Sequence, residues 1–194
     1  MRSLRPIKFM KFTKTLVNCL ALAAWSLISV TPARAADETI WHVKAIHPEG
    51  RLLDVKAIDK DGKIHSVKAI EADGNRHLLD IKAFVNGKRL PVKVLLSDDK
   101  FAPVKAIGED GTIFAIKALT ADGTKLDVKG VSRNGNIINI KTVGPDGTFY
   151  GVKAISPDGR LYDIKGIKMS ADRVEAKVNG VEIAAHLKAL PQAP

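Results

Sequence analysis

Hydrophobic and polar residues alternate in short segments from about residue 40 to the end of the chain, and glycine-containing turns separate the segments. The tetrad Val43-Lys44-Ala45-Ile46 is repeated as Val55-Lys56-Ala57-Ile58 and, with substitutions, in eleven further copies. Successive lysines are mostly 12 residues apart, and they are Lys44, Lys56, Lys68, Lys82, Lys93, Lys105, Lys117, Lys129, Lys141, Lys153, Lys165, Lys177 and Lys188. A two-residue period in segments rich in β-branched side chains predicts one β-strand per copy.

The residues between these segments are those that tight β-turns require. Pro145-Asp146-Gly147 and Pro157-Asp158-Gly159 are typical of three-residue hairpin loops, in which the glycine adopts a left-handed conformation. Asn86-Gly87 and Asn179-Gly180 are typical of two-residue hairpin turns. We therefore predict an all-β fold, an antiparallel meander of about 12 or 13 short strands. A parallel solenoid with one coil per 12 residues is an alternative, but it explains the Pro-Asp-Gly triplets less well.

The two faces of each predicted strand differ in polarity, because side chains alternate along a strand. Counted from the recurring lysine, positions −3, −1 and +1 are nearly all apolar, as in Leu53, Val55 and Ala57. The other face carries the lysine and, in five copies, an acidic residue at position −2. An uncompensated buried ion destabilises a fold by several kcal/mol, so the lysine face must be exposed to solvent. The apolar face must be covered, which predicts that the sheet curls into a barrel-like or sandwich-like form.

Hairpin geometry also predicts which side chains face one another across neighbouring strands. With a three-residue loop, a lysine faces the aspartate ten positions later: Lys44 faces Asp54, Lys117 faces Asp127, and Lys153 faces Asp163. On the other edge of its strand, Asp54 is expected to face Lys68. Each cross-strand ion pair stabilises the sheet by about 0.2–1 kcal/mol.

The first 35 residues predict a cleaved signal peptide. Five basic residues and no acid precede an apolar stretch from Leu16 to Val30, and Ala33 and Ala35 suit a cleavage site after residue 35. The apolar stretch is too short to cross a bilayer, which takes about 20 residues. We therefore expect an exported protein, periplasmic or secreted, with a single β-domain over residues 36–194 and no transmembrane helix after cleavage.

Removal of this segment changes the charge of the chain. The 194 residues include 31 basic and 21 acidic ones, a net charge of +10. Six of the basic residues and the single cysteine, Cys19, lie in the first 35 residues, which leaves a net charge of +4. A mature chain without cysteine has no disulfide and no thiol chemistry.

The repeated unit resembles that of a known group of proteins. The segment 152–163 has the form Val-Lys-Ala-Ile-x-Pro-Asp-Gly-x-Leu-Tyr-Asp, which is similar to the unit of an uncharacterised family of secreted bacterial proteins built from tandem β-repeats. The resemblance covers about residues 40–190, with departures at Arg76-His77 and at the strands containing Pro91 and Pro103. It implies export and repetition, and it implies no assigned activity.

Residues that could carry catalysis follow the repeat and do not interrupt it. The carboxylates recur at turns and at position −2, and no histidine stands in a metal-ligand spacing. We therefore predict no catalytic residues, no metal site and no cofactor. An enzyme or enzyme inhibitor that uses the irregular copies near residues 76–101 is kept as an alternative.

The recurring lysines are explained by protection of strand edges and by solubility, and a second interpretation is polyanion binding, because a regular cationic array attracts extended anions. The candidate residues are Lys93, Lys105, Lys117, Lys141 and Lys153, with Phe101 and Phe149 on the same face. Their strands lack an acid at position −2, where Pro91, Pro103, Ala115, Asn139 and Gly151 stand instead. The sequence does not identify a partner. Anionic polysaccharide and an envelope surface are the candidates, and nucleic acid is disfavoured by export and by the small net charge.

These observations predict an exported, non-enzymatic β-repeat protein that acts as a structural or interaction module. An outer-membrane-associated β-barrel is the remaining alternative, because its strands show the same alternation with apolar side chains toward lipid.

Overall fold

The computed structural model describes residues 38–168 and 177–192 of the chain. Residues 35–194 group as one unit by the contacts between their Cα atoms. The segment 1–35 that is predicted to be a signal peptide lies outside the described residues. Glu175, the fifth acid at position −2, also lies outside them.

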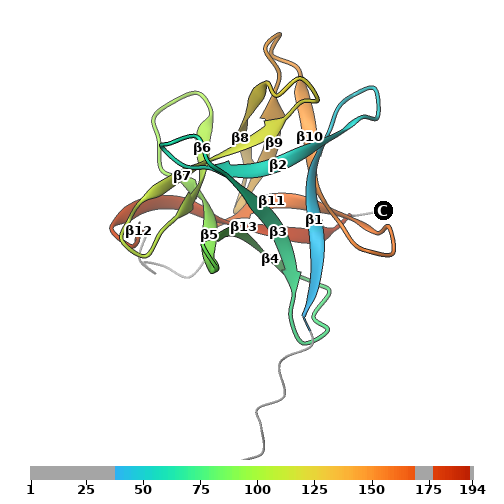
Figure 1. Ribbon diagram of the computed structural model, residues 1–194, viewed down its shortest axis with the longest axis horizontal. Coiled ribbons are helices and arrows are strands. Elements are labelled where there is room, and N and C mark those ends of the chain that lie inside the picture. The colour runs from blue at the N-terminus through green and yellow to red at the C-terminus, as the bar shows by residue number, and fades with distance from the viewer. Residues whose placement is uncertain (1–37, 169–176, 193–194) are drawn as a thin grey trace, which may run out of the picture. The chain divides into compact units, whose positions relative to one another are not determined.

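The described residues form thirteen β-strands in one antiparallel sheet (Figure 1). The strands are β1 (Thr39–Ile46), β2 (Leu52–Ile58), β3 (Ile64–Glu71), β4 (Leu79–Val85), β5 (Lys88–Leu95), β6 (Ala102–Ile107), β7 (Ile113–Leu119), β8 (Lys125–Asn134), β9 (Ile137–Val143), β10 (Phe149–Ile155), β11 (Leu161–Ile167), β12 (Lys177–Val178) and β13 (Val181–Pro191). The predicted all-β antiparallel class and the number of strands are confirmed. None of the described residues belongs to a helix that could cross a membrane.

The predicted turns are present, and they set the register of the hairpins. In the turn between β10 and β11, the Ser156 amide donates to the Arg160 carbonyl at 3.0 Å, and Gly159 has a φ of 87°. In the two-residue turn between β4 and β5, Asn86 and Gly87 both have positive φ, 49° and 79°. Lys153 consequently lies opposite Asp163, as the loop length predicts.

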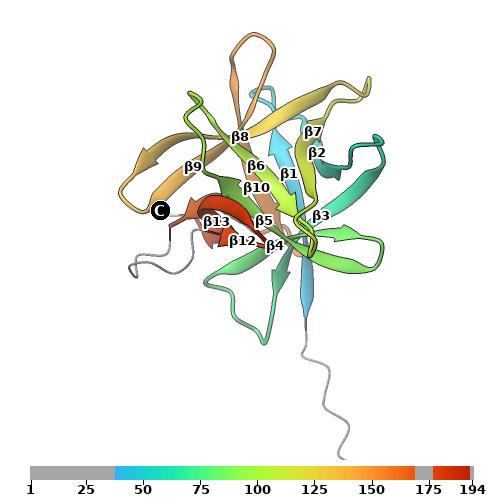
Figure 2. The same cartoon turned by 90° about the vertical axis from the view of Figure 1, so that its left-hand side faces the viewer.

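Among the twelve longer strands, each pairs with three of the others, and β13 pairs in addition with the short β12. The pairings form four groups of three strands: β1, β2 and β3; β4, β5 and β13; β6, β7 and β8; and β9, β10 and β11. Six further pairings connect the groups: β1–β10, β2–β7, β3–β4, β5–β6, β8–β9 and β11–β13. This connectivity is that of a truncated tetrahedron. The strands accordingly run in several directions around one core, and the hairpin loops project outward (Figures 1 and 2).

The three neighbours of a strand result from an uneven use of its two edges. One edge of β1 pairs with β10 from His42 to Ile46. The other edge pairs first with β3, at Thr39–His42, and then with β2, at Lys44–Ile46. The sheet therefore closes around a core and covers its apolar face, as predicted. It differs from a simple barrel or sandwich, in which each strand has only two neighbours.

The change of partner within one edge overturns one predicted contact. Asp54 was expected to lie opposite Lys68 on the second edge of its strand, but it lies opposite Leu119 of β7 there. Lys68 lies opposite His42 and Lys82 instead. The prediction is wrong because β1 and β3 pair with the same edge of β2. β1 pairs with its Leu52–Asp54 part, and β3 pairs only with Lys56–Ile58.

The apolar face of each of the twelve longer strands lies in the interior, as the alternation predicts. Trp41 and Leu79 are fully buried, and so are the small residues at position +1 such as Ala45 and Ala154. The lysine face is outside, where the side chains of the eight ion-paired lysines in the three-strand groups remain 19–28% exposed. Charge and apolar surface are thus separated by the alternation alone.

The small residue at position +1 is required where strands from different groups meet over the core. A Cβ built on Gly166 would lie 2.9 Å from Val94 Cγ2 and 3.1 Å from Ile138 Cβ. A Cβ on Gly151, on the outer face, would meet only Lys153 Cε, at 3.7 Å.

We expect the two glycines to respond oppositely to substitution by alanine. Gly166→Ala overpacks the core and should reduce the free energy of unfolding by about 1–3 kcal/mol. Gly151→Ala should leave it unchanged or raise it by up to about 1 kcal/mol, because the unfolded chain loses freedom. Urea unfolding followed by circular dichroism measures both values. Equal losses in the two variants would contradict the packing that we assign to position +1.

Candidate functional site

Three recurring lysines meet at the centre of each three-strand group. In every group, the lysine of one strand lies opposite the residue at position −2 of the next strand. In the first group Lys44 lies opposite Asp54, Lys56 opposite Ser66, and Lys68 opposite His42. We call each such cluster of three lysines and three facing residues a lysine junction.

The four lysine junctions account for twelve of the thirteen recurring lysines, and Lys177 lies apart from them in β12. Junction 1 contains Lys44, Lys56 and Lys68; junction 2 contains Lys82, Lys93 and Lys188; junction 3 contains Lys105, Lys117 and Lys129; junction 4 contains Lys141, Lys153 and Lys165. Each junction also contains one aspartate, namely Asp54, Asp80, Asp127 and Asp163 in the same order. Three ammonium groups and one carboxylate leave each junction with a net charge of +2.

The aspartate of each junction binds two of its three lysines. In junction 4 Asp163 accepts a hydrogen bond from Lys153 across the strands, and its other oxygen lies 3.6 Å from Lys165 Nζ. The same arrangement recurs around Asp54, Asp80 and Asp127. Burial by itself would raise the pKa of Asp163, but the hydrogen bond and the charges of the two lysines outweigh it and lower the pKa.

The third lysine of each junction has no carboxylate partner among the described residues. These carboxylate-free lysines are Lys68, Lys93, Lys105 and Lys141, and they lie opposite His42, His186, Ala115 and Gly151 respectively. Burial, followed by the charges of Lys82 and Lys188, lowers the pKa of Lys93 to about 8. Burial also lowers the pKa of Lys105 and of Lys68.

A neutral histidine partly replaces the missing carboxylate in two junctions. The Lys93 ammonium group donates to Nδ1 of His186, and Lys68 Nζ lies 3.2 Å from Nδ1 of His42. Burial and the charge of Lys93 lower the pKa of His186, which keeps this imidazole neutral and able to accept. The ammonium groups of Lys105 and Lys141 make no hydrogen bond within the described residues, because alanine and glycine face them.

The five lysines selected from the sequence therefore fall into two classes. Lys93, Lys105 and Lys141 are carboxylate-free, whereas Lys117 and Lys153 are held by Asp127 and Asp163. At position −2 of their strands, Ala115 and Gly151 stand where other copies have an acid. They do not face Lys117 and Lys153 of their own strands; they face Lys105 and Lys141 of the preceding strands. Sequence reasoning missed Lys68, because its facing residue, His42, comes from a strand that is not its hairpin partner.

Each of the six pairings between groups places two recurring lysines directly opposite each other, and two of these pairings join three carboxylate-free lysines into a line. Lys93 lies directly opposite Lys105, and Lys129 lies directly opposite Lys141. Lys105 and Lys129 belong to the same junction. We call Lys93, Lys105, Lys129 and Lys141 the lysine track, and three of its four members are carboxylate-free. Like charges that lie directly opposite destabilise a sheet, so this alignment has a cost for the fold.

The lysine track ends beside the two phenylalanines that the sequence places on the same face. The Phe101 and Phe149 rings are 5.6 Å apart between centroids and nearly perpendicular, at 82°. They line a depression of about 490 Å³ together with Lys100, Ser132, Asn139 and Lys141. We call these six residues the aromatic depression. On the other side of Phe101, a depression of about 410 Å³ is lined in part by Lys129.

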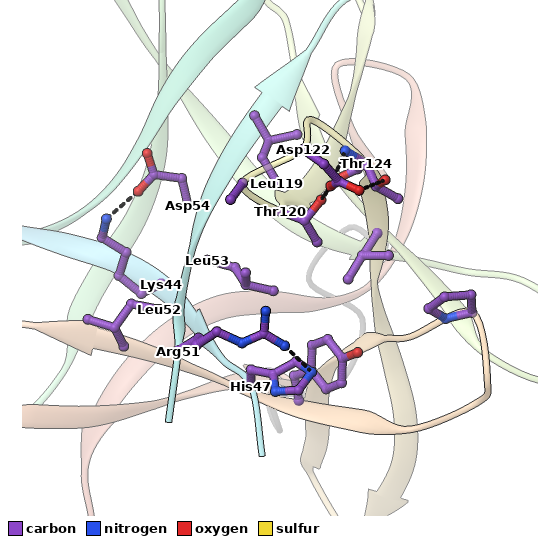
Figure 3. Close-up of a pocket in the computed structure, with 14 residues that line it drawn as sticks. Lys44, His47, Arg51, Leu52, Leu53, Asp54, Leu119, Thr120, Asp122 and Thr124 are labelled. Carbon is purple, nitrogen blue, oxygen red and sulfur yellow. Dashed lines mark hydrogen bonds and ion pairs between the residues drawn. The ribbon is translucent and has the colours of Figure 1, made fainter. Parts of the chain in front are cut away.

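A larger depression of about 900 Å³ lies among three hairpin turns (Figure 3). Its cationic side chains are paired with carboxylates: Lys44 donates to Asp54, and the Arg51 guanidinium lies 2.9 Å from Glu49. The His47 ring packs at 4.7 Å from the Tyr150 ring. This depression therefore offers fewer uncompensated charges than the lysine track.

The irregular copy at Arg76 has a structural role. Glu71 is buried at 3% exposure, and its carboxylate accepts from Trp41 Nε1 at 2.9 Å and from Arg76 Nε at 2.8 Å. Burial would raise the pKa of Glu71, but the hydrogen bonds from Arg76 and Trp41 lower it. The inserted arginine thus compensates a buried carboxylate.

Within residues 38–168 and 177–192, no group of three or more His, Cys, Asp or Glu side chains is arranged to hold a metal ion.

Comparison with known proteins identifies the family. The chain belongs to DUF7486, a family of unknown function whose model matches residues 37–190. Searches of curated proteins and of solved structures give no match.

We expect the partly buried ammonium group of Lys93 to make the stability of the fold depend on pH in the alkaline range. Between its folded pKa of about 8 and its ordinary value of 10.5, the unfolded chain binds more protons than the folded one. The free energy of unfolding should therefore rise with pH in this window. After allowance for partial exposure, the gain between pH 7.5 and pH 9.5 should be about 1 kcal/mol.

Lys93→Met should remove this gain and be more stable than the natural chain at pH 7.5. Lys60→Met, at an exposed turn, is the matched control and should keep the gain. Urea unfolding midpoints at both pH values measure the difference. A Lys93→Met variant with the pH dependence of the natural chain would contradict the assignment.

Proposed function

We propose that this member of DUF7486 is an exported, non-enzymatic β-repeat protein, periplasmic or secreted, that binds polyanions along the lysine track. One observation carries the proposal. Three lysines that have no carboxylate partner within the described residues lie on one continuous line of the outer face, namely Lys93, Lys105 and Lys141.

An extended polyanion suits such a line better than a small anion does. Lysines directly opposite in an antiparallel pair have Cα atoms about 5 Å apart, comparable to the length of one sugar residue. Each contact between an exposed ammonium group and an anion is weak, so affinity requires several contacts along one polymer. The cost of placing Lys93 opposite Lys105 would be offset when an anion lies between them.

The N-terminal sequence supports an extracytoplasmic partner. Five basic residues followed by an apolar stretch favour export, and anionic polysaccharides and envelope surfaces are the polyanions available after export. Nucleic acid is disfavoured for the same reason, and the chain without its first 35 residues carries a net charge of only +4.

The engagement of the recurring carboxylates supports binding over catalysis. The junction aspartates hold lysines, and turn aspartates such as Asp146 accept hydrogen bonds from the backbone and hydroxyl of Thr148. Burial of the apolar face in the interior likewise favours the binding function over a membrane-spanning sheet, whose apolar side chains would face lipid.

Retention on immobilised heparin tests the proposal. The track variant Lys93→Gln/Lys105→Gln/Lys141→Gln should elute at clearly lower salt than the natural chain. The slope of the logarithm of affinity against the logarithm of salt concentration should fall by about 2, since three cation contacts are lost.

The matched control removes the same charge from exposed positions at a turn and at the first residue of β5, as Lys60→Gln/Lys63→Gln/Lys88→Gln. It should elute close to the natural chain. Equal loss of retention in the two triple variants would mean that only net charge matters, and the proposal would fail.

A further inference from the structure

We propose that the aromatic depression at the end of the lysine track holds one acidic sugar residue, a pyranose that bears a carboxylate or sulfate group. The inference rests on the proposed function and specifies its polymer as an acidic polysaccharide. Four features of the depression lead to it, and they concern its rings, its cations, its hydroxyl donor and its local backbone.

The two phenylalanine rings form an aromatic corner on the outer face, where the other exposed large apolar side chains of the described residues are aliphatic. Phe149 is 45% exposed, and the Phe101 ring meets it edge to face at 5.6 Å. The aliphatic C–H groups on the flat face of a pyranose ring pack well against such an aromatic surface. The corner therefore has the shape and chemistry for a sugar ring, which a purely electrostatic site would not need.

The cations of the depression face no carboxylate. Lys141 lies opposite Gly151, and the nearest atom to a Cβ built there is Lys153 Cε at 3.7 Å, so no side chain covers the ammonium group from that position. Lys100 Nζ lies 5.2 Å from the Phe101 ring centroid. Among the residues that the structure describes, none that lines the depression is acidic. Two ammonium groups beside an aromatic corner complement a sugar that carries an anionic substituent.

Ser132 supplies an oriented hydrogen-bond donor. Lys165 Nζ donates to Asn139 Oδ1 at 2.8 Å, and Asn139 Nδ2 donates to Ser132 Oγ at 3.0 Å. Because the Ser132 oxygen accepts from Asn139 and lines the depression, its own O–H remains available to donate to a ligand there. Donors in such a chain polarise one another, which suits recognition of a sugar oxygen.

A β-bulge places Ser132 on this face. The register between β8 and β9 shifts between Gly130 and Ser132, so that Ser132 lies opposite Asn139. Without the extra residue, Ser132 would point to the interior, because side chains alternate along a strand. The bulge is a departure from the repeat at the point where a specific contact is needed, which supports a binding role.

Calorimetric titration with tetragalacturonate tests the inference, with linear polyphosphate of equal charge as the comparison polyanion. Phe149→Ala should weaken tetragalacturonate binding about tenfold and leave polyphosphate binding unchanged, since only the sugar uses the ring. Ser132→Ala should weaken the binding of tetragalacturonate only. Phe84→Ala removes another phenylalanine from the lysine face, beside Arg89, and should change neither affinity. Far-ultraviolet circular dichroism of each variant establishes that the fold is retained.

The outcomes separate this inference from the proposed function. If Phe149→Ala leaves tetragalacturonate binding unchanged, or weakens polyphosphate binding equally, the sugar site is refuted while polyanion binding stands. Tighter Phe149-dependent binding of oligothymidylate would assign the corner to a nucleobase and overturn the sugar. If the natural chain binds neither anion, the proposed function itself is refuted.

Discussion

An ammonium group cannot be buried without a compensating charge, and this constraint orients every strand of the protein. Each long strand carries one recurring lysine at its centre, so that side of the strand must face water. The neighbouring positions −1 and +1 then face inward, and they supply a core of Val, Ile and Ala residues. Because the residue at +1 is small, strands from four groups can approach one another over a single interior. The tetrahedral connectivity thus depends on the separation of charge from apolar surface.

The same constraint acts within the lysine junctions, where three ammonium groups meet around one carboxylate. Each aspartate forms ion pairs with two lysines. The third lysine of each junction therefore has no carboxylate partner among the described residues, and in two junctions it contacts a neutral histidine. Such charges reduce stability, as the lowered pKa of Lys93 indicates. Three of these lysines lie in the lysine track beside the exposed aromatic corner. An anion bound there would offset the loss of stability that their charges cause.

Local features of the chain could be read from the sequence because they depend on neighbouring residues. Turn type, strand spacing and the Lys153–Asp163 contact follow from a loop of three residues. The contact of Lys188 with Asp80, 108 residues away, does not follow from any loop. The grouping of Lys117 and Lys153 with the uncompensated lysines was wrong for a different reason. It compared each lysine with position −2 of its own strand, although hairpin geometry already pairs these lysines with Asp127 and Asp163 of the next strand. Phe101 and Phe149 could be placed on one face, but their contact depends on which strands meet.

The sequence by itself determined which side of each strand faces water, because alternation and turn chemistry are local properties. It also determined that consecutive strands are antiparallel and that lysine faces the aspartate ten positions later within a hairpin. Only the tertiary structure decided which lysines lack a carboxylate and which of them lie in line. The physical reason is that one edge of each strand pairs with a strand from another group, and the other edge is shared between two partners. Hairpin geometry specifies at most one partner on each edge, and long-range packing over the common core selects the others.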